Sequence, residues 1–145
     1  MDWITQLQGK TIGLDTAPLI YFIEENPDYI DRVQIFFESM ERGDFTVVTS
    51  TVTLLEVLVQ PLRMHKKELA EEYRDILLNS KLQTLDISAS ISEHAAKLRA
   101  AYRIRTPDAI QISAALSAGA DLFFTNDIRL PEIPSIQFLF LDAIL

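Results

Sequence analysis

Short apolar runs of strand length alternate along this chain with longer segments of helical periodicity. Thr11–Leu14 and Leu122–Thr125 are examples of the short runs, and the segments between such runs repeat their apolar residues every three or four positions. Strands that alternate with helices are typical of βαβ units, in which neighbouring strands are parallel and helices cover the sheet. The sequence therefore predicts an α/β fold of three layers, α/β/α, around a central, mostly parallel, five-stranded sheet.

The pattern predicts five strands and six helices. The expected strands are Thr11–Leu14, Phe45–Thr49, Leu82–Leu85, Leu122–Thr125 and Ile136–Leu141. The expected helices are Thr16–Glu25, Pro27–Arg42, Ser50–Val59, His65–Asn79, Ser88–Tyr102 and Thr106–Gly119.

Several residues indicate where the helices begin and end. Thr16 can cap one helix, and Thr106 can cap another that has Pro107 at its first position. Pro61 is expected to stop the helix that precedes it, and Gly43 follows the end of another.

The chain of 145 residues has the size of a single domain, and residues 1–9 form a short N-terminal extension with no assigned function. It contains no cysteine, which excludes disulfides, thiolate nucleophiles and cysteine-based zinc sites. The N-terminus lacks the pattern of a secretory signal, and no apolar run is long enough to span a membrane. We therefore expect a cytoplasmic protein without a membrane partner.

Four carboxylates stand at positions that a parallel sheet would bring together. Asp15 follows the first expected strand and Asp127 follows the fourth, while Glu56 and Asp108 lie near the starts of helices. Because ligands bind beyond the carboxyl ends of parallel strands, we expect these side chains to converge at one edge. Like charges held close repel each other, and a hard divalent cation with oxygen ligands relieves that repulsion.

Each carboxylate also has a purely structural interpretation. Asp15 could form a turn into its helix, and Glu56 could close a capping box with Thr53. Asp108 could favour the positive end of its helix, and Asp127 could be a turn residue.

Other chemistries lack their motifs. The chain has only four glycines and contains neither a dinucleotide-binding nor a phosphate-binding glycine pattern. No nucleophile elbow is present, and His65 and His94 are isolated residues of predicted helix surfaces.

The chain resembles the PIN-domain nucleases, and especially the VapC toxins of bacterial toxin–antitoxin pairs, from about Thr11 to Leu141. The resemblance depends on the order and spacing of four segments with the sequences LDTAPLI, LEVL, TPDAIQISAA and LFFTND, which begin at Leu14, Leu55, Thr106 and Leu122. It implies a PIN-like fold and a Mg²⁺- or Mn²⁺-dependent endoribonuclease. It also implies the toxin role in a type II toxin–antitoxin pair, with an antitoxin partner and a homodimer.

The same resemblance assigns roles to the four carboxylates. Asp15 and Asp108 match the principal metal ligands of the family, and Asp127 matches a further acidic residue near the metal. Glu56 matches a catalytic residue that acts through water or a second ion. The supporting hydroxyl groups that it implies are those of Thr16 and Thr125.

A net charge of −8 argues against binding nucleic acid through bulk positive charge. Nine of the 13 basic residues nevertheless lie between positions 46 and 107, which leaves room for a local cationic surface. The first candidates for RNA contacts are Arg99, Arg103, Arg105 and Arg129, and a second cluster comprises Arg63, Lys66 and Lys67. For both groups the alternative is a solvated face or a partner contact.

Four further functions compete with a toxin ribonuclease, of which a purely structural interaction protein would leave the gathering of the carboxylates unexplained. One is a PIN-like module that binds RNA or protein without cleavage, and another is an RNA-processing PIN nuclease without an antitoxin. An unrelated phosphate enzyme, such as a receiver domain or a dehalogenase-like phosphatase, fits less well. The phosphatases place an aspartate where this chain has Ala17, and both families use a lysine near the later strands, whereas no lysine follows Lys97.

Overall fold

The computed structural model describes residues 2–144, and within them five strands form one parallel sheet in the order β3-β2-β1-β4-β5. Every strand pairing is parallel, which confirms the predicted α/β architecture. β1 lies at the centre, so the ends of β1 and β4 meet at the same edge. The strands are β1 Thr11–Leu14, β2 Thr46–Ser50, β3 Gln83–Leu85, β4 Leu122–Thr125 and β5 Gln137–Phe140.

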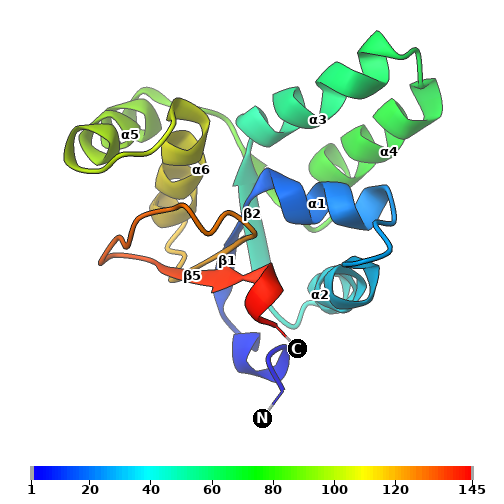
Figure 1. Cartoon of the computed structure of the whole chain (residues 1–145), viewed down its shortest axis with the longest axis horizontal. Helices are drawn as coiled ribbons and strands as arrows, with labels where there is room; N and C mark the ends of the chain where they lie inside the picture. The colour runs from blue at the N-terminus through cyan, green and yellow to red at the C-terminus, as the bar shows by residue number, and fades with distance from the viewer. Residues whose placement is uncertain (1, 145) are drawn as a thin grey trace.

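Helices cover both faces of the sheet, as Figure 1 shows. α1 and α2 lie on one face, α5 and α6 lie on the other, and the hairpin of α3 and α4 projects beyond the body of the domain (Figure 1). The α-helices are α1 Thr16–Ile23, α2 Ile30–Arg42, α3 Thr51–Arg63, α4 Lys67–Leu78, α5 Ala89–Ala101 and α6 Thr106–Ser117, and the short 3-10 helices are Thr5–Leu7 and Leu141–Ala143.

Two apolar cores separate the three layers. Phe36 of α2 packs with Phe124 on one side of the sheet, whereas Ile112 of α6 packs with Phe123 on the other. Phe123 and Phe124 are neighbours in β4, and successive strand residues point to opposite faces. A continuous apolar strand thus supplies both cores, as expected for a sheet that is buried on both faces.

Gly13 of β1 allows α6 to approach the sheet closely. A Cβ atom built on Gly13 would lie 2.5 Å from the Cβ of Ala115 and 2.8 Å from the Cδ1 of Phe123. Any side chain at this position would therefore push α6 away. Since Asp108 lies in the first turn of α6, this contact helps to set the position of that carboxylate relative to β1.

Some predicted helix boundaries are wrong, and local contacts explain the differences. α3 continues through Pro61 to Arg63, because the Pro61 ring is buried and the loss of one helical hydrogen bond does not break the packed helix. α2 begins at Ile30 rather than Pro27, because the Asn26 side chain accepts a hydrogen bond from the Asp28 amide and forms a turn there.

The two predicted threonine caps are also wrong. Asp15, and not Thr16, caps α1 by accepting a hydrogen bond from the Thr16 amide at 2.8 Å. Thr106 is the first residue of α6, and its hydroxyl accepts a hydrogen bond from Arg99 at 2.8 Å. Arg105 takes the capping position without a side-chain cap.

The described part of the N-terminal extension packs against the domain. Leu7 is buried in the core, and the ring of Trp3 lies 6.2 Å from that of Phe124. The Gly9 amide donates to the Asp44 carbonyl at 2.8 Å. Within residues 2–144, none of the helices has the length and apolar character needed to cross a bilayer.

Candidate functional site

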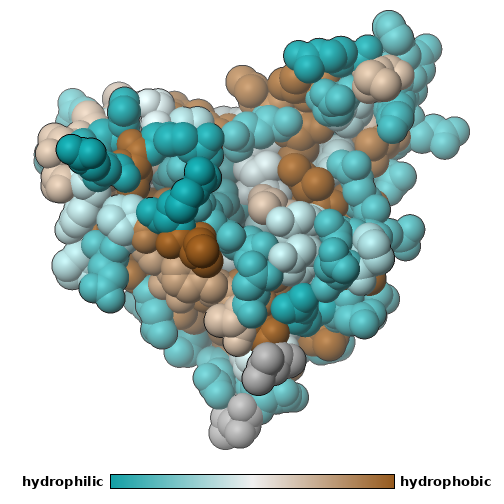
Figure 2. Space-filling model, viewed as in Figure 1, coloured by the Kyte–Doolittle hydropathy of each residue, from teal (hydrophilic) through white to brown (hydrophobic). Residues whose placement is uncertain are grey.

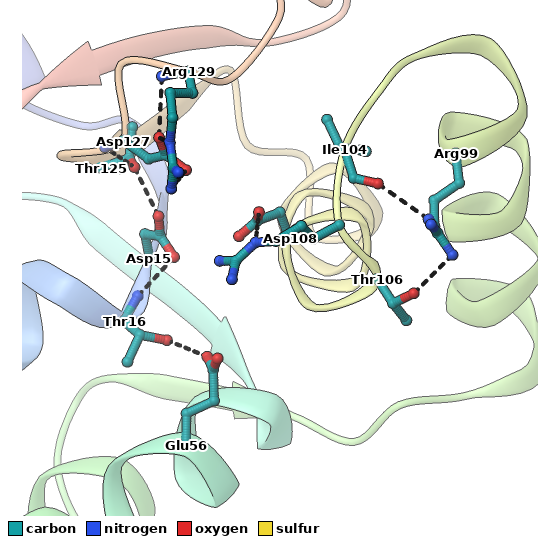
Figure 3. Close-up of polar contacts among 11 residues, drawn as sticks. Asp15, Thr16, Glu56, Arg99, Ile104, Thr106, Asp108, Thr125, Asp127 and Arg129 are labelled. Atoms are coloured by element: carbon teal, nitrogen blue, oxygen red, sulfur yellow. Dashed lines mark hydrogen bonds and ion pairs between the residues drawn. The ribbon is translucent and has the colours of Figure 1, made fainter.

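An open pocket lies where β1 and β4 end, and all four predicted carboxylates line it. They reach it from the end of β1, from α3, from the first turn of α6 and from the loop after β4 (Figure 3). The predicted convergence at one edge of the sheet is therefore observed. The lining residues are Asp15, Thr16, Ala17, Ile20, Tyr21, Glu56, Arg105, Asp108, Asn126, Asp127, Ile128 and Arg129.

Asp15 is the most constrained of these carboxylates. Its Oδ1 accepts a hydrogen bond from the Thr16 amide at 2.8 Å, and its Oδ2 accepts one from the Thr125 hydroxyl at 2.7 Å. Burial raises the pKa of Asp15 above its ordinary value, although these two hydrogen bonds act to lower it. The negative charges of Asp108 and Glu56 raise this pKa further. The environment of Asp15 thus disfavours its ionised form, while two hydrogen bonds to its oxygens favour that form.

Asp127 is linked to Asp15 through Thr125. The Thr125 hydroxyl donates to Asp15 and also accepts a hydrogen bond from the Asp127 amide at 3.1 Å. The Asp127 Oδ1 accepts from both the backbone amide and the Nε of Arg129, each at 3.0 Å. Burial acts to raise the pKa of Asp127, but the hydrogen bonds and charge of Arg129 outweigh burial and lower it. The turn predicted for Asp127 is thus present within the pocket.

Asp108 and Glu56 complete the ring of carboxylates. Asp108 is only 8% exposed, and its Oδ2 accepts a hydrogen bond from Arg105 Nε at 3.1 Å. Glu56 Oε1 accepts a hydrogen bond from the Thr16 hydroxyl at 2.7 Å. Since Ser50 caps α3, the alternative capping box between Thr53 and Glu56 is not formed.

The donor set fits a hard divalent cation by its chemistry. Within residues 2–144, no three acidic or imidazole side chains already converge on one point in the manner of a metal site. The pocket nevertheless offers only oxygen ligands, and the negative charges of Asp108 and Glu56 disfavour the ionised form of Asp15. A bound cation of two positive charges would relieve this repulsion between like charges.

A buried polar network behind the pocket was missed at the sequence level. Gln111 of α6 is 2% exposed, and its Oε1 accepts a hydrogen bond from Ser50 Oγ at 2.8 Å. Its Nε2 donates to the hydroxyls of Thr53 and of Thr16, the latter at 3.3 Å. Thr53 also shares a hydrogen bond of 2.9 Å with Thr49.

The spacing of this network was the signal that could have revealed it. Gln111 follows Asp108 by three residues, and Thr53 precedes Glu56 by three, so each lies on the same helix face as a site carboxylate. A glutamine within an otherwise apolar stretch of helix indicates a buried polar contact.

The predicted RNA-binding arginines fall into separate places. Arg105 and Arg129 line the pocket, and Arg103 lines an adjoining hollow together with them. Arg99 lies beyond α6, on the side away from Asp15 (Figure 3). There its Nε donates a hydrogen bond to the Ile104 carbonyl at 3.1 Å, which stabilises the turn between α5 and α6. The second basic cluster, Arg63, Lys66 and Lys67, lies around the tip of the α3–α4 hairpin (Figure 1).

Comparison with known proteins identifies the family. The profile of the PIN domain matches residues 12–136. The chain belongs to the PIN domain family. This confirms the resemblance found in the sequence. No curated protein sequence matches the chain significantly.

Solved structures share the PIN fold at low sequence identity. VapBC2 from Rickettsia felis, solved with a DNA fragment from the promoter, has a TM-score of 0.71 and 24% identity over 90% of this chain and 98% of its own. A toxin–antitoxin complex from Klebsiella pneumoniae has a TM-score of 0.68 and 21% identity over 91% of this chain and 98% of its own. VapC20 from Mycobacterium tuberculosis, described as a sarcin–ricin loop cleaving toxin, has a TM-score of 0.67 and 15% identity over 83% of this chain and 92% of its own.

Proposed function

We propose that this protein is a Mg²⁺- or Mn²⁺-dependent endoribonuclease and the toxin of a type II toxin–antitoxin pair. The observation that carries the proposal is the gathering of four carboxylates around one pocket, where the charges of Asp108 and Glu56 help to raise the pKa of the half-buried Asp15. Membership of the PIN domain family supports a nuclease. The similarity to VapC20, a toxin described as cleaving the sarcin–ricin loop, supports RNA as the substrate.

Three of the carboxylates would hold the cation, namely Asp15, Asp108 and Asp127. When bound, the cation would supply positive charge to the scissile phosphate and would activate a water for attack on phosphorus. The Thr125 hydroxyl and the Thr16 amide orient the Asp15 carboxylate for this role.

Glu56 would accept the proton that the attacking water loses. Its Oε1 is already engaged by the Thr16 hydroxyl at 2.7 Å, so the side chain is oriented towards its neighbours in the pocket. The second carboxylate oxygen would accept a hydrogen bond from the water and take up its proton. Thr16 therefore supports two carboxylates, Asp15 through its amide and Glu56 through its hydroxyl.

The rim of the pocket would guide the RNA backbone. Arg105 and Arg129 lie at its edge with side chains 69% and 81% exposed, and Arg103 is exposed beside them. Guanidinium groups recognise phosphate by paired hydrogen bonds. The acidic floor would thus bind the cation while the basic rim binds the substrate, which reconciles a net charge of −8 with an RNA substrate.

An antitoxin partner, a homodimer and a cytoplasmic location are further parts of the proposal. The structures from Rickettsia felis and Klebsiella pneumoniae contain toxin–antitoxin pairs, which supports an antitoxin. Leu55, Val59 and Leu62 are 66%, 43% and 54% exposed at helical spacing on α3, and Figure 2 shows hydrophobic surface on this projecting part of the molecule. Such a stripe is typical of a protein contact surface. Light scattering of the isolated chain tests the dimer.

The deciding experiment is RNA cleavage with Mg²⁺ or Mn²⁺, with and without EDTA. Asp15→Asn and Asp108→Asn should abolish cleavage, and EDTA should do the same to the native chain. Asp31→Asn, which changes an exposed acid on α2 outside the pocket, is the matched control and should cleave normally. Folded site variants that cleave at the native rate would exclude the proposal. Cation binding without cleavage of any RNA would instead indicate a non-catalytic PIN module.

A further inference from the structure

Two arginines occupy carboxylate oxygens that the proposed cation would need. Arg105 Nε lies 3.1 Å from Asp108 Oδ2, and Arg129 Nε lies 3.0 Å from Asp127 Oδ1. In the part of the chain that the structure describes, Asp15 and Glu56 form no ion pair and accept hydrogen bonds from neutral donors. Two of the four carboxylates thus have a positively charged partner, and the other two do not.

We propose that Arg105 and Arg129 are internal counter-ions that a divalent cation displaces, and that the released guanidinium groups then bind RNA phosphates. This inference rests on the proposed function and adds a sequence of events to it. The same two side chains stabilise the metal-free pocket and, after exchange, bind the substrate.

The charges of the pocket match such an exchange. Four carboxylates and two guanidinium groups line it, and their formal charges sum to −2 when all are ionised. One divalent cation neutralises that net charge. With the arginines still at the rim the pocket is then formally neutral, and an incoming phosphate supplies the negative charge that the guanidinium groups can bind in place of Asp108 and Asp127.

The geometry of the ion pairs allows the arginines to leave easily. The arginine side chains are 69% and 81% exposed, whereas those of Asp108 and Asp127 are 11% and 20% exposed. Ion pairs that face water on one side are weak. Each arginine is within three residues of its partner, so release requires only a change of side-chain rotamer. Asp127 also keeps its hydrogen bond from the Arg129 backbone amide after the side chain leaves.

The inference predicts opposite effects on two ligands. Arg105→Gln and Arg129→Gln should bind Mn²⁺ more tightly than the native chain, because the cation no longer has to displace a guanidinium group. The same variants should bind RNA more weakly in the presence of Mn²⁺, because the phosphate contact is lost. A merely structural role for the arginines would not improve cation binding.

Isothermal titration with Mn²⁺ tests the first effect without any need for activity. Each single variant should bind Mn²⁺ about threefold to tenfold more tightly than the native chain, and the double variant more tightly still. Arg74→Gln is the matched control, because Arg74 forms an ion pair with Glu71 at the same spacing of three residues on α4, away from the pocket. It should bind Mn²⁺ as the native chain does. Asp15→Asn should lose the binding, which locates it in the pocket.

Fluorescence anisotropy with a short phosphorothioate RNA tests the second effect. Mn²⁺ should tighten RNA binding by the native chain and by Arg74→Gln, and this gain should be lost in the double arginine variant. An unchanged gain in the double variant would overturn the substrate half of the inference.

The outcomes separate this inference from the proposed function. If Asp15→Asn abolishes Mn²⁺ binding but the arginine variants bind no more tightly than the native chain, the inference fails and the metal site stands. If only the double variant binds Mn²⁺, the arginines block the site and the cation does not displace them, so the inference fails. If no form binds Mn²⁺ in the pocket, both fail. If the arginine variants tighten Mn²⁺ binding as expected but no form cleaves RNA, the counter-ion role stands and the nuclease assignment fails.

Discussion

The carboxylate pocket and the polar network behind it lie side by side at one edge of the sheet, yet they are built in opposite ways. In the network, Gln111 hydrogen-bonds to hydroxyls from α1, α3 and the end of β2, and none of its members carries a charge. In the pocket, burial and two neighbouring carboxylates oppose the ionised form of Asp15 and raise its pKa. A neutral, satisfied network stabilises a fold, whereas a charged and incompletely neutralised group is a candidate for ligand binding.

Thr16 belongs to both regions and shows how one supports the other. Its hydroxyl accepts a hydrogen bond from Gln111 and donates one to Glu56 at 2.7 Å, while its amide donates to Asp15. The neutral network can therefore keep the side chains of the pocket in place, although the carboxylates of the pocket repel one another. Four substitutions test this division.

Asp15→Asn should have the largest effect, with opposite signs for activity and stability. Loss of a principal cation ligand should lower RNA cleavage by at least about a hundredfold. The same change should raise the melting temperature of the protein in EDTA, because it removes a carboxylate whose pKa is raised by burial. A lower melting temperature would show that Asp15 is instead part of the stabilising framework.

The stability gain from Asp15→Asn should depend on pH with a defined sign. The folded protein binds a proton at Asp15 more readily than the unfolded chain does, so ionised Asp15 opposes folding at neutral pH. The difference in melting temperature should be greatest above the pKa of folded Asp15 and should shrink as the pH falls through it. Thermal unfolding in EDTA over a pH series measures this.

Gln111→Leu should destabilise the protein by about 2–3 kcal/mol, because the buried hydroxyls of Ser50 and Thr53 lose their partner. Urea unfolding measures the change, and Gln34→Leu on the exposed face of α2 is the matched control. A neutral result for Gln111→Leu would remove the distinction between a stabilising network and a functional pocket.

Gly13→Ala should disturb both regions together, since α6 carries both Asp108 and Gln111. The added methyl group would overlap Ala115 and Phe123, which should destabilise the fold by about 1–3 kcal/mol. Mn²⁺ binding should weaken as well. Gly119→Ala is the control for steric overlap, because a Cβ atom on Gly119 would have no neighbour within 4 Å. Any destabilisation in that variant would come from the backbone strain of its positive φ. If Mn²⁺ binding stays unchanged in Gly13→Ala, the close packing of α6 does not position the site.

Thr125→Val should have the smallest effect on stability, about 1 kcal/mol, through loss of the hydroxyl that joins Asp15 and Asp127. The pKa of Asp15 should rise further, because a hydrogen bond that lowers it is removed. Proton competition at Asp15 should then weaken Mn²⁺ binding several-fold at mildly acidic pH and less at alkaline pH. Thr125→Ser, which keeps the hydroxyl, should restore the native affinity.

Much of the architecture could be predicted because it depends on local patterns. The core strands and the helix spacing follow from periodicity, and the strand-end positions of Asp15 and Asp127 follow from the strands. Predictions about single helix ends were less successful. Pro61 lies inside α3 because tertiary packing of its ring outweighs the local preference of proline to end a helix.

The sequence by itself determined a parallel α/β domain and the gathering of four carboxylates, because parallel strands carry the residues at their carboxyl ends to a common edge. Only the tertiary structure decided which charges are paired, which are left unpaired and which hydroxyls hold them. The hydrogen bonds from Thr125 to Asp15 and from Gln111 to Thr53 join residues 110 and 58 positions apart. No local periodicity encodes such pairs, since they exist only when separate elements pack together.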